Sequence, residues 1–158
     1  MTTEVGKHTQ WIDFVVLVLA FIGALIAAGG SLMILIDQAQ MPGSPVWPLP
    51  GLVLMDWAIL GVLGCLGAYF GRKPFSARWR KVSWFVAGAL IPLVILGAFS
   101  IGPLVLVSLL FFLASTLLIA IQKKEKWLEH LGLLMVGAVG NLGLLLLFIA
   151  IGNPAINS

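Results

Sequence analysis

The nine Lys and Arg residues of this chain occupy three short clusters, and long apolar runs separate the clusters. Lys7 precedes the first apolar run, residues 72–81 hold the second cluster, and residues 123–126 hold the third. In multi-pass membrane proteins, basic residues concentrate in the loops that stay on the cytoplasmic side. The remaining connections carry no basic residue, so one membrane orientation places all three clusters on the same side. The charge pattern therefore predicts a polytopic membrane protein.

Composition supports the same class of protein. Hydrophobic residues make up 61% of the chain and charged residues 9%, whereas an ordinary soluble domain is about 45–50% apolar and about 25% charged. A chain this short cannot bury so much apolar surface in a water-soluble core. We therefore expect a lipid bilayer as its environment. The net charge of +3 comes from residues that flank the apolar runs, so we expect no nucleic-acid partner.

The number of membrane spans depends on one long apolar stretch, residues 82–121. As a single helix it would be about 60 Å long, twice a hydrocarbon core of roughly 30 Å. Gly102 and Pro103 divide it, because Gly permits a turn and Pro suits the start of a new helix. We predict an all-α bundle of five transmembrane helices with the N-terminus inside and the C-terminus outside, a single integral membrane domain over residues 1–158. The predicted spans are residues 11–36, 52–70, 82–99, 103–121 and 131–151.

Tryptophan residues fall at the predicted span boundaries. Trp is enriched at membrane–water interfaces, so we interpret these residues as interfacial anchors, with stacking on a ligand as the alternative. The inner boundary holds Trp11, Trp79, Trp84 and Trp127, and the outer boundary holds Trp47 and Trp57. We expect the membrane to be the plasma (inner) membrane of a prokaryote.

Small residues recur at steps of three or four in the first two predicted spans, and therefore lie on one face of each helix. Such stripes let helix backbones approach closely in lipid, where hydrophobicity gives no drive to associate. We predict that the first two spans form a close pair. The predicted contact residues are Gly23, Ala27, Gly61, Gly64 and Ala68.

Two aspartates lie near the predicted outer side. Asp37 ends the first span and Asp56 lies about one turn into the second, and no Lys or Arg is available on that side to pair with them. An unpaired acid in a membrane is costly and is often functional. We predict that both acids share the outer mouth between the first two spans. There they attract cations, share a proton or bind a donor on a partner chain, or they simply reach headgroup water.

Asn141 is the strongly polar side chain closest to the middle of a predicted span. Lipid offers an amide no hydrogen-bond partner, so we expect Asn141 to face the bundle and link helices. The predicted partners are Ser108, Ser115 or Thr116 of the fourth span, or Ser31 of the first.

The sequence holds no motif typical of a catalytic, cofactor or metal site. No His, Cys, Asp and Glu cluster has metal-ligand spacing, and no phosphate-binding or nucleophile motif occurs. His8 and His130 lie at the inner boundary, and we interpret both as interfacial residues near solvated charges. We therefore expect no enzyme, no catalytic residue, no bound metal and no cofactor.

These features predict a non-enzymatic structural or accessory subunit that acts through helix packing, with a membrane protein partner or as a homo-oligomer. The alternative is a small transporter, a channel, or a protein that binds lipid or another hydrophobic ligand. It would use the acids at the outer mouth, with Asn141. The basic loop over residues 71–81 is predicted to meet anionic lipid headgroups.

Overall fold

The structure, a computed structural model, describes residues 3–43, 48–73, 76–123, 125 and 127–152. The described residues form five helices and no strand, and each helix is long and apolar enough to cross a membrane. The predicted all-helical fold, with five helices that could each span a membrane, is therefore confirmed. In chain order the helices are α1 (Thr3–Gln40), α2 (Leu49–Gly71), α3 (Ala77–Leu96), α4 (Gly102–Lys123) and α5 (Trp127–Gly152).

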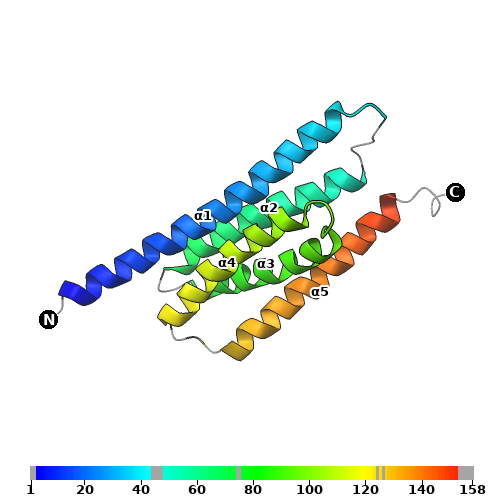
Figure 1. Cartoon of the computed structure of the whole chain (residues 1–158). Coiled ribbons are helices and arrows are strands. Elements are labelled where there is room, and N and C mark those ends of the chain that lie inside the picture. Colours follow the sequence, from blue (N-terminus) through cyan, green and yellow to red (C-terminus); the bar gives the residue numbers. More distant parts are fainter. Residues whose placement is uncertain (1–2, 44–47, 74–75, 124, 126, 153–158) are drawn as a thin grey trace.

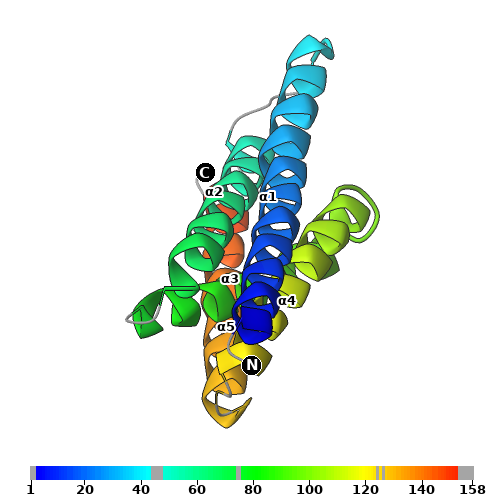
Figure 2. The same cartoon turned by 90° about the vertical axis from the view of Figure 1, so that its left-hand side faces the viewer.

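The five helices do not contribute equally to the bundle (Figures 1 and 2). Helices α2, α3 and α4 contact one another at the centre, whereas α1 packs on α2 and α4, and α5 packs on α3 and α2. Among the described residues, α1 and α5 make no close contact with each other. The first turns of α1 project beyond the other helices (Figure 1). Helices α1 and α5 are therefore the flanks of the bundle, and each exposes a broad apolar face.

The side chain of Phe112 on α4 packs against both α1 and α2. It is fully buried, and it lies against both Gly23 of α1 and Gly64 of α2. A Cβ atom on Gly64 would lie 2.6 Å from a Phe112 ring carbon, and one on Gly23 would lie 3.3 Å from the same ring. The small residues at these two positions therefore make room for an aromatic ring from a third helix.

The predicted close pairing of the first two spans is present, and its detail differs from the prediction. Gly61 of α2 does face α1, because a Cβ atom there would lie 2.5 Å from the Ala27 Cβ. Ala68 is buried in the same helix. Gly23 and Gly64 instead face α4, as described above, so the stripes serve a seam of three helices rather than of two.

The turn between α3 and α4 lies where the sequence predicted a break, with slightly different limits. Helix α3 ends at Leu96 and α4 begins at Gly102, so the predicted third span is too long at its C-terminal end. The Gly102 amide donates to the Gly97 carbonyl at 2.6 Å. A Cβ on Gly102 would lie 2.6 Å from that carbonyl oxygen, so this tight turn requires glycine. At its other end α3 begins at Ala77, before the predicted start at residue 82. The helix therefore includes part of the basic segment.

Two tryptophans predicted as interfacial anchors are buried instead. Trp57 has no exposed surface and packs over Gly30 of α1, where a Cβ would lie 2.8 Å from the indole ring. Trp84 is 5% exposed and contacts His130 of α5. Trp11 remains largely exposed at the start of the first span, as an anchor requires. Trp47 and the side chain of Trp127 lie outside the described residues.

Candidate functional site

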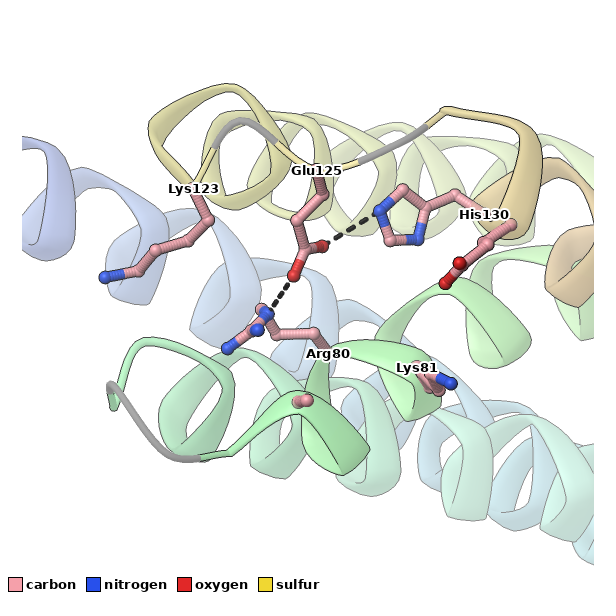
Figure 3. A pocket seen from close by; sticks show the side chains of 7 residues that line it. Arg80, Lys81, Lys123, Glu125 and His130 are labelled. Carbon is pink, nitrogen blue, oxygen red and sulfur yellow. Dashed lines mark hydrogen bonds and ion pairs between the residues drawn. The ribbon is translucent and has the colours of Figure 1, made fainter.

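A cluster of polar side chains joins three elements at the end of the bundle that carries the basic residues (Figure 3). Glu125 lies in the connection between α4 and α5, and its Oε1 accepts a hydrogen bond from Nε of Arg80 on α3. Its Oε2 lies 2.9 Å from Nε2 of His130, in the first turn of α5. The His130 ring stacks on Trp84, with ring centroids 4.9 Å apart and an interplanar angle of 11°. We name these four residues the Glu125 cluster.

The sequence explains how α3 supplies two members of the Glu125 cluster. Arg80 and Trp84 are four residues apart and therefore project from the same face of the helix. Arg80 lies in the basic first turn of the helix, whereas Trp84 lies about one turn further along, where the apolar part begins. The α4–α5 connection then brings Glu125 over Arg80 and His130 over Trp84.

His130 was predicted to be an interfacial residue near solvated charges, and this prediction is wrong. The residue is only 5% exposed, because Trp84 covers one face of its ring and Glu125 faces its edge. The sequence signal that was missed is Glu125, a single acid within a run of lysines. When a carboxylate such as that of Glu125 is buried, a cationic side chain must lie beside it to compensate for the loss of water. Here Arg80 and His130 lie beside it.

A charged recess of about 430 Å³ adjoins the Glu125 cluster. Basic side chains from α3 and from the end of α4 meet acidic side chains from the α4–α5 connection and α5 around it (Figure 3). The residues that line the recess are Ala77, Arg80, Lys81, Lys123, Glu125, Glu129 and His130.

Asn141 faces the bundle, as predicted, but its partner is a different helix. Its Nδ2 donates to the Ala89 carbonyl of α3 at 2.7 Å, and the residue is 5% exposed. The predicted partners on α4 and α1 are wrong, because in the described part of the chain α5 contacts neither of those helices. The hydroxyls of Ser31, Ser108, Ser115 and Thr116 instead donate to main-chain carbonyls.

Asp37 and Asp56, which were predicted to share the outer mouth, have different surroundings in the structure. Asp56 is buried, and its carboxyl group interacts with the side chain of Asn141. Asp37 is exposed, and it borders a surface groove that Leu104 of α4 also lines. The polar neighbour of Asp56 is thus Asn141 on α5. The neighbour predicted from the sequence was instead Asp37 of the first span. A functional role for Asp37, Asp56 and Asn141 stays a prediction.

An apolar cavity of about 360 Å³ lies at the opposite end of the bundle from the Glu125 cluster. Leu54, Leu93 and Leu145 line its inner wall, and Gln38 is one of its few polar neighbours. The Gln38 Oε1 is buried and accepts no hydrogen bond from the described residues. The mostly apolar lining of this cavity suits an apolar ligand.

Within the part of the chain that the structure describes, no group of three or more His, Cys, Asp or Glu side chains could hold a metal ion. Comparison with known protein families, with curated proteins and with solved structures finds no match for this chain.

Proposed function

We propose that this chain is a non-enzymatic structural or accessory subunit that acts through helix packing in the membrane. The observation that carries the proposal is a contrast between its glycines. Gly88 and Gly137 fill the seam between α3 and α5, where a Cβ on either would overlap a main-chain atom of the other helix. Gly132, Gly140 and Gly143 lie on the exposed side of α5, and a Cβ on any of them would meet nothing within 4 Å.

The three open glycines share one face of α5. They recur at steps of eight and three residues, which places them on the same side of a helix with 3.6 residues per turn. Glycine costs about 1 kcal/mol relative to alanine inside a helix, and no contact with the described residues compensates for that cost here. In lipid, glycine faces allow the backbone of another helix to approach closely. The proposed occupant is a transmembrane helix of a partner protein or of a second copy.

A carrier of protons or small cations is the second candidate function. It is favoured by Asp56, whose Oδ2 is buried without a hydrogen-bond partner among the described residues. An acid within a membrane is by default a functional hypothesis. The apolar cavity beside Leu54 and Leu93 favours, in the same class, binding of a hydrophobic ligand.

Replacing Gly140 by leucine tests the first proposal against the second. The added side chain would project from the open face of α5, so we expect recovery of co-purifying partner subunits, or of the homo-oligomer, to fall about tenfold. The measurement is purification from the native membrane in mild detergent without crosslinking. Leu142→Phe enlarges an exposed side chain that lies about 160° from Gly140 around α5 and should leave recovery unchanged.

Two results would count against the subunit proposal. One is equal recovery of partners with Gly140→Leu and with the unaltered chain. The other is loss of ion flux in proteoliposomes with Asp56→Asn while assembly is unaffected, which would favour the carrier.

We also propose that the end of the bundle with the basic residues faces the cytoplasm. Support comes from Lys73, Lys81 and Lys123, which belong to the α2–α3 and α4–α5 connections or adjoin them, at the same end as the start of α1. A reporter enzyme active only outside the cytoplasm, fused after the last residue, should therefore be active. A fusion that is active only in the cytoplasm would reverse the orientation. The prokaryotic plasma (inner) membrane stays a prediction.

A further inference from the structure

The charged recess beside the Glu125 cluster contains buried side-chain nitrogens that have no hydrogen-bond partner among the described residues. His130 is 5% exposed, and its Nδ1 has no hydrogen-bond partner among them. The Nη1 of Arg80 is also buried and lacks a partner within the described structure. Both residues line the recess. The Arg80 Nη1 is a permanent donor, whereas the His130 Nδ1 donates when the ring is protonated, because its Nε2 faces the Glu125 carboxylate. Buried polar groups of this kind are normally paired with protein, water or a ligand.

The charges around the recess favour an anion. Lys81 and Lys123 lie on either side of Arg80 and are exposed (Figure 3). Glu125 already contacts Arg80 and His130, so much of its charge is balanced within the protein. Glu129 is an exposed acid in the lining and opposes an anion. Among the described residues, three permanent cations and two acids therefore line the recess, which leaves a positive balance.

We propose that this recess binds a phosphate group. A phosphate offers several acceptor oxygens, which suits an arginine fork and lysine point charges that converge from different elements. The recess lies at the end of the bundle where the chain leaves the apolar region, at the level of lipid headgroups. The phosphate can belong to a phospholipid or to a soluble phosphate ester. The proposal is independent of the role of α5 in assembly.

The test uses the full chain purified in a neutral detergent. In one arm, phosphatidylglycerol is added and bound lipid is counted by native mass spectrometry, with diacylglycerol as the phosphate-free comparison. In the other arm, inorganic phosphate binding is measured by equilibrium dialysis. We expect retention of phosphatidylglycerol over diacylglycerol, binding of inorganic phosphate, or both. Binding in the lipid arm alone identifies a headgroup, and binding in the dialysis arm alone identifies a soluble ligand.

Variants decide whether the recess is the site. Lys81→Gln and Lys123→Gln should each weaken binding about fivefold, the effect expected for one basic residue near a phosphate. Arg78→Gln and Lys73→Gln are the matched controls, because both residues are exposed at the same end and neither lines the recess. They should change binding less than twofold. Glu129→Gln should tighten it.

Two outcomes would overturn the proposal. One is the absence of binding in both arms. The other is an equal loss with Arg78→Gln and with Lys81→Gln, which would show attraction to the basic end as a whole. All of the substituted side chains are exposed, and an unchanged circular dichroism spectrum checks that each variant is folded.

Discussion

Replacing Glu125 by alanine should lower the free energy of unfolding by about 3 kcal/mol, because removal of one partner from a buried ion pair costs roughly 3–5 kcal/mol. The substitution leaves Nε of Arg80 without its acceptor and removes the carboxylate that faces His130. The side chains of Arg80 and Glu125 are 14% and 18% exposed, so we expect the lower end of that range. Unfolding in mixed micelles with increasing dodecyl sulfate, followed by circular dichroism, measures the change.

Glu129→Ala is the matched control for this prediction. Glu129 lies near the same recess on α5, but it is exposed. Surface substitutions of this kind usually change stability by about 0.5 kcal/mol or less. If the two variants lose equal stability, the Glu125 cluster does not hold α3 to the α4–α5 connection.

The number and class of the elements follow from the sequence because membrane insertion reads the chain one segment at a time. Each apolar run is long enough to cross the bilayer, and the basic clusters mark alternate connections. The break at Gly102 is equally local, since a turn this tight admits no side chain there. Span limits taken from hydropathy are less accurate. Helix α3 begins at Ala77 because Arg78 and Arg80 are compatible with a helix that has left the apolar core.

The partners of each helix face do not follow from the sequence. In a water-soluble bundle, polar residues mark the outer face of a helix, whereas here both faces are apolar. Asn141 had to face inward, yet nothing in the spacing indicated that α5 would pack on α3 rather than α4. The packing of Phe112 against Gly23 and Gly64 could not be predicted for the same reason, because the sequence does not show which helices are neighbours.

The candidate site was missed for a related reason. Charged residues next to a membrane usually set topology, and this explanation accounted for Arg80 and Lys123 without a site. Residues 80 and 125 are far apart in sequence, and only the packing of the α4–α5 connection onto α3 brings them together. The stacking of His130 on Trp84 depends on the same contact.

Replacing Gly88 by alanine should lower the free energy of unfolding by about 3 kcal/mol, the upper end of the usual cost of overpacking. The new Cβ would overlap the Leu134 carbonyl of α5, and Gly137 faces the Phe85 carbonyl of α3 in the same way. Both clashes would be with main-chain carbonyl oxygens, which cannot move as a side chain can. The clash at residue 88 is therefore removed only if α3 and α5 separate. Separation would also stretch the hydrogen bond from Asn141 to Ala89. The same dodecyl sulfate unfolding measures the loss.

Gly132→Ala places the identical change at a position where a Cβ meets nothing within 4 Å. Alanine is favoured over glycine in a helix by up to about 1 kcal/mol, so this control should leave stability unchanged or raise it. The two substitutions therefore differ in the sign of their effect although the chemistry is the same. A shift in the same direction for both would mean that helix propensity governs the result. In that case the close approach of α3 and α5 at Gly88 would not be what holds α5 to the bundle.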